Sequence, residues 1–283
     1  SHAVTCQGAN AKIALEKENL EVVAINDLTD DKTLAHLLKH DSSYGTYARE
    51  VKVGNGEIIV NGKTIKSFAE PDPTKLPWKD LGVDVVLECS GVFNNRDGAG
   101  KHIAAGAKKV VLSAPPKSDD IPVFLIGVNE NELKAEEDII SNGSCTTNCL
   151  APMIKVLDEK FGVEKGFLTT VHSYTNSQRI LDLPHKDLRE ARAAGQNIIP
   201  TTTGAAKTVA KAIKSMEGNL DGISMRVPTP VVSVTDFVGI LKKEVSVEEI
   251  NSAFREAAAG NLKNILDISE EELVSMDFKG NSH

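Results

Sequence analysis

The 283-residue sequence lacks the marks of several protein classes. Its four cysteines, Cys6, Cys89, Cys145 and Cys149, show no CxxC pair and no metal-ligand spacing. We therefore expect neither a metal site nor a disulfide framework, and this cysteine usage is typical of the reducing cytoplasm. No apolar run approaches the roughly 20 residues that span a bilayer, and no signal-peptide pattern is visible. The sequence thus predicts a cytoplasmic protein without a membrane partner.

A basic surface is also lacking. Asp and Glu number 40 against 32 Lys and Arg, which gives a net charge of −8. This balance argues against a general nucleic-acid or anionic-membrane partner. An anionic substrate must therefore be bound by local groups rather than by the field of the whole protein. With 41% hydrophobic residues, the chain is long enough for about two domains, each with its own core.

Glycine is missing where a dinucleotide-binding unit needs it. Gly8 is the only glycine before Gly45. The G-x-G-x-x-G turn, which lets backbone N–H groups approach a pyrophosphate, is therefore absent. We expect a short strand at residues 3–6, a helix at 9–20 and a buried strand at 20–25.

Asp27 follows the last of these strands and has two interpretations. Its carboxylate can accept hydrogen bonds from an adenosine ribose, which would favour NAD over NADP because a 2′-phosphate would meet a negative charge. Alternatively, Asp27 is a solvated residue at the start of a loop. Ser113 follows the apolar strand expected at 109–113 and is either a cofactor contact or the cap of a turn.

Strands alternate with helices through the first half, and a β-hairpin is expected to turn at Asn61-Gly62. Further apolar strands are expected at 83–89, 109–113, 123–127 and 139–140. This alternation predicts an α/β fold, with a doubly wound parallel, Rossmann-type domain over residues 1–144. The second half has longer strands, at 166–173, 222–227 and 231–241, and helices at 203–215 and 247–259. It predicts an α+β domain with a mostly antiparallel sheet over residues 145–283.

The most informative stretch is Ser141-Asn-Gly-Ser-Cys-Thr-Thr-Asn-Cys149. It places Cys145 where an apolar segment gives way to a helix. Ser144 and Thr146 are residues of the N-cap type. A thiol at a helix N-terminus lies at the positive end of the helix dipole, which favours the nucleophilic thiolate. The alternative is a buried, inert cysteine, which we expect for Cys149.

A base for this thiol is available in Phe167-Leu-Thr-Thr-Val-His-Ser-Tyr-Thr175, which predicts a strand with His172 near its end. Polar residues around His172 interrupt an otherwise apolar strand. A Cys–His pair is the usual arrangement of an activated thiol. The alternative is a histidine satisfied by the core or by solvent, and spacing alone does not bring the two residues together.

The runs Ser144-Cys-Thr-Thr-Asn148 and His172-Ser-Tyr-Thr175 make the chain resemble the phosphorylating glyceraldehyde-3-phosphate dehydrogenases. From about residue 15 to the end, the likeness also includes these runs: Ala24-Ile-Asn-Asp27, Glu88-Cys-Ser-Gly91, Leu112-Ser-Ala-Pro115, His185-Lys-Asp-Leu-Arg189, Thr202-Thr-Gly-Ala-Ala206 and Met225-Arg-Val-Pro-Thr-Pro230. The resemblance implies an NAD-dependent oxidoreductase of glycolysis, with Cys145 as nucleophile and His172 as base. Cys145 would attack the aldehyde of glyceraldehyde 3-phosphate, and inorganic phosphate would cleave the resulting thioester to 1,3-bisphosphoglycerate.

The resemblance also implies two anion sites and a quaternary structure. Thr175 and Arg226 would bind the substrate's own phosphate. Inorganic phosphate or neighbouring oxygens would contact Ser144, Thr146, Arg189, Thr203 and Gly204. Each arginine taken singly could equally be a solvated surface charge. The irregular segment 175–199 corresponds to a family loop that reaches the cofactor site of a neighbouring subunit, which implies a homotetramer.

Two departures from the family pattern leave other functions open. The glycine fingerprint is absent, and the chain stops at His283, where the family continues with further strands and a closing helix. One alternative is the same fold with a reactive Cys145 but weak or no NAD binding. The other is a related dehydrogenase that acts on erythrose 4-phosphate.

Overall fold

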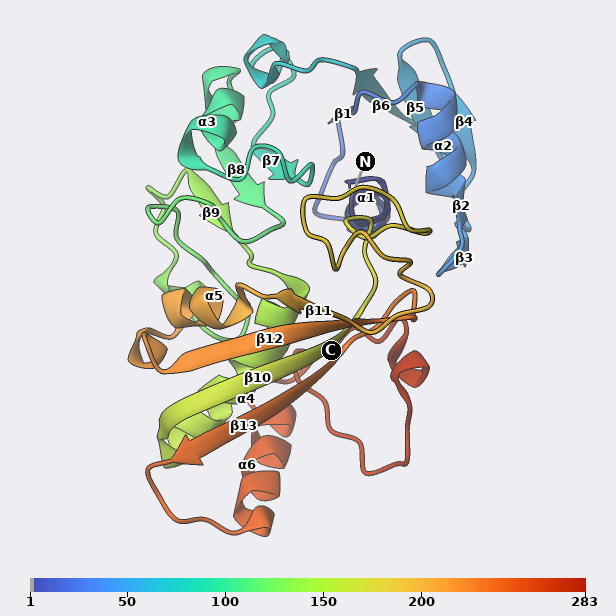
Figure 1. The fold of residues 1–283 in the computed structure, drawn as a ribbon. Coiled ribbons are helices and arrows are strands. Elements are labelled where there is room, and N and C mark those ends of the chain that lie inside the picture. Colours follow the sequence, from blue (N-terminus) through green and yellow to red (C-terminus); the bar gives the residue numbers. More distant parts are fainter. Residues whose placement is uncertain (1–2) are drawn as a thin grey trace. The chain divides into compact units, whose positions relative to one another are not determined.

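The computed structural model describes the backbone of residues 3–283 and the side chains of residues 9–283 (Figure 1). The chain forms two compact units. Unit 1 is Ser1–Ser113 with Glu136–Ile139, and unit 2 is Ala114–Ala135 with Ile140–His283. The sequence predicts domains at residues 1–144 and 145–283. This division differs from that of the two units, and it stays a prediction.

Unit 1 begins with a helix where the sequence predicts a strand at 3–6. That prediction is wrong: α1 runs over Ala3–Glu16. Four of the 14 residues are Ala, the residue that favours a helix most, and the single Gly8 costs only about 1 kcal/mol inside it. β1 covers Ala24–Asn26 and is shorter than the strand expected at 20–25.

β1 is the edge of a four-stranded sheet with the order β1-β6-β5-β4. β5 (Glu57–Val60) and β6 (Lys63–Phe68) form the expected hairpin, in which Asn61 and Gly62 both have positive φ, as a type I′ turn requires. β4 is Val51–Val53. β1 runs parallel to β6, and α2 (Asp31–Lys39) packs against this sheet.

A second sheet has the order β7-β8-β9. β7 (Val85–Glu88) and β8 (Lys109–Leu112) are parallel and are connected through α3 (Arg96–Ala104), as in a βαβ unit. β9 is Ile139–Ser141. The parallel pairs of the first half therefore lie in two sheets, with β1 and β7 as edge strands.

The prediction of a strand at 123–127 is wrong. Only Val123 makes an isolated bridge there, to Ser141. The Asn129 amide takes the place of a partner strand, because it accepts the Leu125 N–H and donates to the Val123 carbonyl, both at 2.9 Å. The remaining short elements are β2 (His40–Asp41), β3 (Gly45–Thr46), η1 (Pro73–Lys75), η2 (Glu130–Glu132), η3 (Lys214–Met216) and η4 (Ser275–Phe278).

Unit 2 is built on a four-stranded sheet with the order β11-β12-β10-β13. The strands are β10 (Val163–Ser173), β11 (Ile199–Thr202), β12 (Leu220–Val227) and β13 (Val234–Leu241). β10 and β12 are parallel, whereas β10–β13 and β11–β12 are antiparallel. The mostly antiparallel sheet expected for the second half is therefore confirmed.

Helices α4 (Cys145–Phe161) and α5 (Ala205–Ala212) pack against this sheet, and α6 (Val247–Ala259) packs on α4 (Figure 1). Leu150 and Ile154 of α4 share a core with Leu168 of β10 and Val209 of α5. Burial of each such side chain contributes about 1.5–3 kcal/mol. This core therefore fixes the start of α4 relative to the strands that carry the candidate site.

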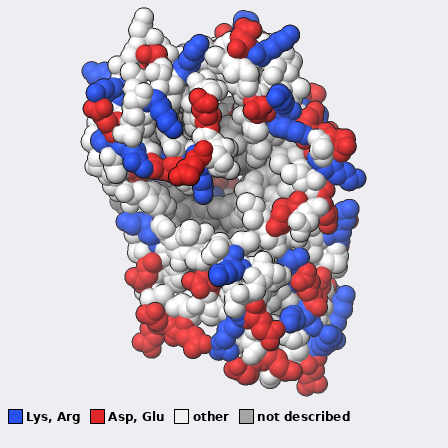
Figure 2. All heavy atoms as spheres, turned by 180° about the vertical axis from the view of Figure 1, so that it is seen from behind, with Lys and Arg blue, Asp and Glu red and all other residues white. Residues whose placement is uncertain are grey.

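None of the described helices is long and apolar enough to cross a membrane. On the face drawn in Figure 2, Lys and Arg side chains are interspersed with Asp and Glu. Within the described part of the chain, no group of three or more His, Cys, Asp or Glu side chains is arranged to bind a metal ion.

Candidate active site

Cys145 is the first residue of α4. Ser144 caps this helix, because its Oγ accepts a hydrogen bond from the Thr147 N–H at 3.1 Å. The turn into the helix is tight at Gly143, where φ is +69° and an added Cβ would lie 3.0 Å from Thr147. The exposed thiol of Cys145 thus lies at the positive end of a 17-residue helix.

β10 brings His172 to this thiol. The Cys145 Sγ and His172 Nε2 atoms lie 3.3 Å apart, so the structure joins the two residues that spacing alone does not connect. Desolvation raises the pKa of Cys145, but the contact with His172 and hydrogen bonds with Thr146 outweigh it and lower the pKa below its ordinary value. Desolvation instead raises the pKa of Cys149. Cys145 is therefore the more readily ionised thiol of the two.

His172 Nδ1 has two neighbours with opposite requirements. The Ser173 carbonyl, 2.7 Å away, only accepts, so it favours a hydrogen on Nδ1 and leaves Nε2 able to take a proton. Arg226 Nη1, 2.5 Å from Nδ1, only donates and favours the other tautomer. An anion that draws Arg226 away from His172 would therefore favour the tautomer that acts as a base.

Arg226 lies opposite His172 in the parallel pair β10–β12. Its Nε is buried and has no hydrogen-bond partner among the described residues. Burial lowers the pKa of Arg226, although a guanidinium remains charged at neutral pH. A half-buried guanidinium whose Nε donor is buried and unpaired among the described residues is suited to binding an anion, above all a phosphate or carboxylate.

The start of α5 provides a second set of N–H groups. Thr203 Oγ1 accepts the Ala205 N–H at 3.2 Å, and the exposed N-cap residue Gly204 has open space beside its Cα. α4 and α5 share a core that includes Leu150 and Ala206 from their N-terminal halves. Two helix N-termini with neighbouring hydroxyls therefore belong to one packed helix pair, and such termini favour anions.

Thr175 and Arg189 lie in the irregular segment 175–199. The Thr175 N–H donates to Gln178 Oε1 at 2.9 Å, and its hydroxyl lies 3.0 Å from that of Ser177. The Arg189 side chain is exposed and makes no hydrogen bond to another described residue. The structure therefore brings Cys145, His172 and Arg226 together, but Arg189 does not contact them.

Sequence reasoning missed two residues that support this site. Gln178 is buried, and the spacing Thr175-x-x-Gln178 is that of a capping box, a signal that could have identified it. Glu190 accepts a hydrogen bond from the Thr201 hydroxyl at 3.1 Å, and its charge favours the charged form of Arg226. No local pattern marks Glu190, because these partners lie 11 or more residues away.

The two expected cofactor contacts lie in different sheets of unit 1. Asp27 directly follows β1, and its Oδ1 accepts the Thr29 N–H at 2.9 Å. Ser113 directly follows β8, is exposed, and donates its N–H to the Glu88 carbonyl at 3.0 Å. Both residues stand at the carboxyl ends of parallel strands, where α/β sheets bind ligands. No contact between them occurs among the described residues.

Parallel βα units and a histidine-paired cysteine at a helix N-terminus define an enzyme with a nucleotide-binding fold and a thiol nucleophile. Two family models match the chain. "Glyceraldehyde 3-phosphate dehydrogenase, NAD binding domain" covers residues 9–96, and "Glyceraldehyde 3-phosphate dehydrogenase, C-terminal domain" covers residues 144–283. The chain therefore belongs to the glyceraldehyde 3-phosphate dehydrogenase family, which confirms the resemblance and the expected fold class.

Curated relatives agree with this assignment. The chain is 57% identical to a glyceraldehyde-3-phosphate dehydrogenase of Geobacillus stearothermophilus over 272 residues, which are 96% of this chain and 81% of the relative. It is 56% identical to the Priestia megaterium enzyme of that name, over 95% of this chain and 81% of the relative. The chloroplastic A form of Scenedesmus vacuolatus is 56% identical over 92% of this chain and 83% of the relative.

Proposed function

We propose that this chain catalyses the NAD-dependent oxidation and phosphorylation of glyceraldehyde 3-phosphate to 1,3-bisphosphoglycerate, a step of glycolysis. The observation that carries the proposal is the 3.3 Å contact between Cys145 and His172 at the start of α4. Relatives named glyceraldehyde-3-phosphate dehydrogenase are 55–57% identical to the chain over most of its length. NAD is the cofactor, in agreement with the family's NAD-binding domain.

Cys145 and His172 account for the covalent chemistry. The Cys145 thiolate adds to the aldehyde carbon and forms a hemithioacetal. His172 Nε2 takes the proton of the hemithioacetal hydroxyl as the carbon loses a hydride, which leaves a thioester on Cys145. NAD, when bound, supplies the hydride acceptor. An oxygen of inorganic phosphate then attacks the thioester carbonyl, so that an acyl phosphate leaves and the thiolate is regenerated.

Two sets of groups are assigned to the phosphates in this scheme. Arg226, with its unpaired buried Nε, and Thr175 bind the phosphate of the substrate. Inorganic phosphate is bound by Ser144, Thr146, Arg189, Thr203 and Gly204. Substrate that draws Arg226 from His172 leaves the Ser173 carbonyl as the partner of Nδ1. His172 then acts as a base only once the substrate's phosphate is in place.

The residues of unit 1 fit the ribose part of NAD. The Asp27 carboxylate stands at the carboxyl end of β1, where it would accept hydrogen bonds from the adenosine ribose. Ser113 would contact the cofactor from the end of β8. The helical segment Ala3–Glu16 contains no glycine-rich strand-to-helix turn.

A burst experiment tests the proposed reaction. The purified chain is mixed with glyceraldehyde 3-phosphate and NAD in the absence of phosphate, and absorbance of NADH is followed while intact mass is measured. We expect NADH equivalent to one acyl group per chain, with the added mass on the Cys145 peptide. Inorganic phosphate should then convert the burst into steady turnover.

Two variants make the experiment decisive. Cys145→Ser should abolish the burst, whereas Cys149→Ser, one helical turn away, should retain it. A Cys145→Ser variant that still turns over would refute the assignment of the nucleophile. If NADH forms at the same steady rate without phosphate, the thioester is hydrolysed and phosphate is not the acceptor.

We further propose that the chain acts in the cytoplasm as a homotetramer. One face of the unit 2 sheet exposes apolar side chains: Phe167, Val171, Ile223, Val234, Val238 and Ile240. Val238 is 66% exposed and pairs across the strands with Phe167, so these residues form one patch of the kind that marks an interface. In the segment 175–199, Ile180 is 88% exposed and Leu188 82%.

Light scattering after gel filtration tests this assembly. Val238→Lys should lower the measured mass because a charge would be buried in the interface. Val247→Lys is the matched control, since Val247 is 75% exposed on α6, away from the sheet face. A wild-type chain that stays monomeric at micromolar concentration would contradict the proposal.

A further inference from the structure

A chain of hydrogen bonds between buried side chains ends at the turn that follows β7. Trp78, His102 and Glu88 are all buried. The Trp78 indole N–H donates to His102 Nδ1 at 3.1 Å, and His102 Nε2 lies 3.1 Å from Glu88 Oε2. Glu88 Oε1 accepts hydrogen bonds from the Ser90 N–H, at 2.7 Å, and from the Ser90 hydroxyl. The chain therefore connects three core side chains to the backbone of one turn.

Trp78 fixes the tautomer of His102. An indole N–H can only donate, so His102 Nδ1 must accept and carries no hydrogen. The hydrogen of the neutral imidazole is then on Nε2, which donates to Glu88. Each hydrogen bond between these side chains thus has one direction, from Trp78 through His102 to the carboxylate.

Glu88 is the acceptor on which this chain converges. Burial raises the pKa of Glu88, but the hydrogen bonds from His102 and Ser90 outweigh it and keep the pKa below its ordinary value. A buried ionised group is a poor source of stability, because its desolvation offsets its hydrogen bonds. What the three donors determine is geometry, since they meet at one carboxylate and fix the place of Ser90.

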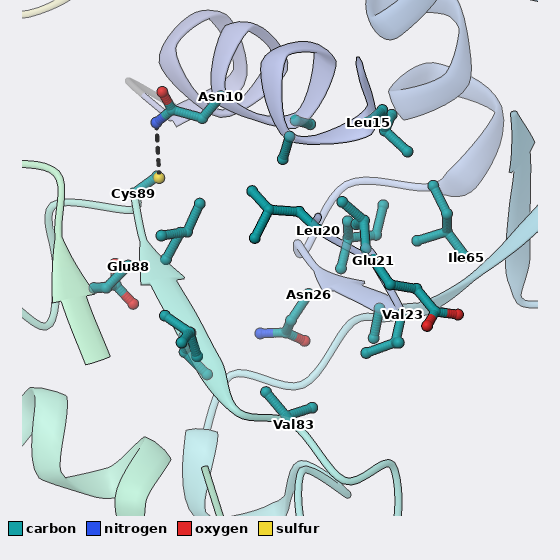
Figure 3. A pocket seen from close by; sticks show the side chains of 18 of the residues that line it. Asn10, Leu15, Leu20, Glu21, Val23, Asn26, Ile65, Val83, Glu88 and Cys89 are labelled. Carbon is teal, nitrogen blue, oxygen red and sulfur yellow. Dashed lines mark hydrogen bonds between the residues drawn. The ribbon is translucent and has the colours of Figure 1, made fainter. Parts of the chain in front are cut away.

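The turn that Glu88 fixes lies in the region expected to bind the cofactor. Ser90 and Gly91 follow β7 at the carboxyl end of a parallel strand, where α/β sheets bind ligands. Gly91 is exposed and has no side chain, so a ligand can approach its backbone closely. Ser90 and Asp27 line the same cavity of unit 1, and Figure 3 shows Glu88 at the end of β7 beside it.

We propose that Glu88 is a positioning residue for NAD, whose carboxylate, oriented by His102, keeps the Ser90–Gly91 turn in the conformation that the cofactor contacts. This inference rests on the proposed dehydrogenase function. The Glu88 backbone fixes the neighbouring turn as well, because its carbonyl accepts the Ser113 N–H after β8. A turn that is ordered before binding loses little conformational freedom when the ligand arrives. Loss of the chain should therefore weaken NAD binding and leave the chemistry at Cys145 intact.

Glu88→Gln tests this role with almost no change of shape. A carboxylate offers only acceptors, whereas an amide also has an NH₂ group. In either orientation this NH₂ group meets a donor, which is the Ser90 N–H or the His102 Nε2–H, so one donor loses its acceptor. Ordering the backbone of one residue corresponds to about a tenfold change in an equilibrium constant. We therefore expect the Kd of NAD, measured by calorimetry, to rise about tenfold.

Hydrogen exchange in the chain without NAD measures the turn itself. The Ser90 N–H donates to the Glu88 side chain, whereas the Ser113 N–H donates to the Glu88 backbone. Glu88→Gln should therefore speed exchange of the Ser90 amide at least tenfold and leave that of the Ser113 amide unchanged. The Ser113 amide is thus an internal control against general unfolding of unit 1.

Steady-state kinetics and a second variant separate positioning from a loss of stability. Glu88→Gln should raise the KM for NAD while kcat is retained, because Cys145 and His172 are unchanged. Val60→Ala is the control, since it shortens a buried side chain of β5 in the core of the other sheet and should change neither the Kd nor Ser90 exchange.

The outcomes distinguish this inference from the proposed function. An unchanged Kd in Glu88→Gln, with or without faster Ser90 exchange, would refute the positioning role. An equal rise of the Kd in Val60→Ala would also refute it, because the effect would then follow from lost stability. A parent chain that binds no NAD would instead overturn the proposed function, and this inference with it.

Discussion

Replacement of His172 by Asn should change the reactivity of Cys145 in opposite directions at neutral and alkaline pH. The imidazole lies 3.3 Å from Sγ and lowers the pKa of the thiol. A hydrogen bond to a charged group contributes about 1.5–3 kcal/mol, and the exposure of Cys145 places this one at the lower end. Since about 1.4 kcal/mol is a factor of ten, the variant should have about tenfold less thiolate near neutral pH.

The remaining thiolate is, however, the stronger nucleophile. Thiolate nucleophilicity rises with basicity with a Brønsted slope of about 0.4–0.5, so a tenfold weaker acid reacts about threefold faster once ionised. The variant should therefore be alkylated about threefold more slowly at about pH 7 and about threefold faster at about pH 10, where both thiols are ionised. Because the pKa is lowered in the parent chain, its labelling rate should fall with decreasing pH at a lower pH than that of the variant.

Iodoacetamide labelling of the Cys145 peptide, followed by mass spectrometry across this pH range, measures both rates. His36→Asn is the control, because His36 is exposed on α2 in unit 1 and its loss should leave both rates unchanged. A change of the same sign at both pH values would refute the reasoning, since it would mean that His172 acts through access or folding rather than through the ionisation of the thiol.

Three further predictions concern stability, measured by urea or thermal unfolding. Burial raises the pKa of Glu88, but hydrogen bonds from His102 and Ser90 outweigh it and lower the pKa below its ordinary value. The resulting stability is present above the unfolded pKa of about 4.3 and is lost as pH falls through the folded pKa. Glu88→Gln should therefore reduce the loss of unfolding free energy at acid pH, as measured by Trp78 fluorescence. Gly106→Ala should cost about 2–5 kcal/mol, because φ is +107° and the new Cβ would lie 2.4 Å from Lys79, whereas Gly62→Ala, with φ +82° and open space, should cost about 1–2 kcal/mol. Ser246→Ala removes the capping box of α6 and should cost about 1 kcal/mol, and an unchanged urea midpoint would contradict its role.

Elements whose signals are local could be predicted from the sequence. α6 covers the residues that its apolar spacing predicts, and Ser246 with Glu249 caps it reciprocally. The hairpin turn at Asn61-Gly62 follows from the positive φ that these two residues tolerate. In the candidate site, Ser144 and Cys145 are likewise placed by a local rule, the start of a helix.

The partners within the site depend on register, which no local pattern encodes. His172 meets Arg226 because β10 and β12 pair in parallel with these residues opposite each other, 54 positions apart in the chain. The Ser173 carbonyl acts on Nδ1 through the same strand geometry. Motifs therefore identify the candidate residues, but only the pairing of the sheet shows that Arg226 and the Ser173 carbonyl both lie against His172 Nδ1.

The strand predictions at 20–25 and 123–127 failed for the same physical reason, which is that strand length is set by pairing. Residues 20–25 are apolar enough for a strand, but β1 is held on one side only, by β6, and regular pairing is confined to Ala24–Asn26. Residues 123–127 have strand-like composition too. The Asn129 side chain, however, makes hydrogen bonds with the Leu125 N–H and the Val123 carbonyl, which a partner strand would otherwise bond. Apolar sequence thus favours a strand, whereas the supply of backbone partners decides how much of the segment becomes one.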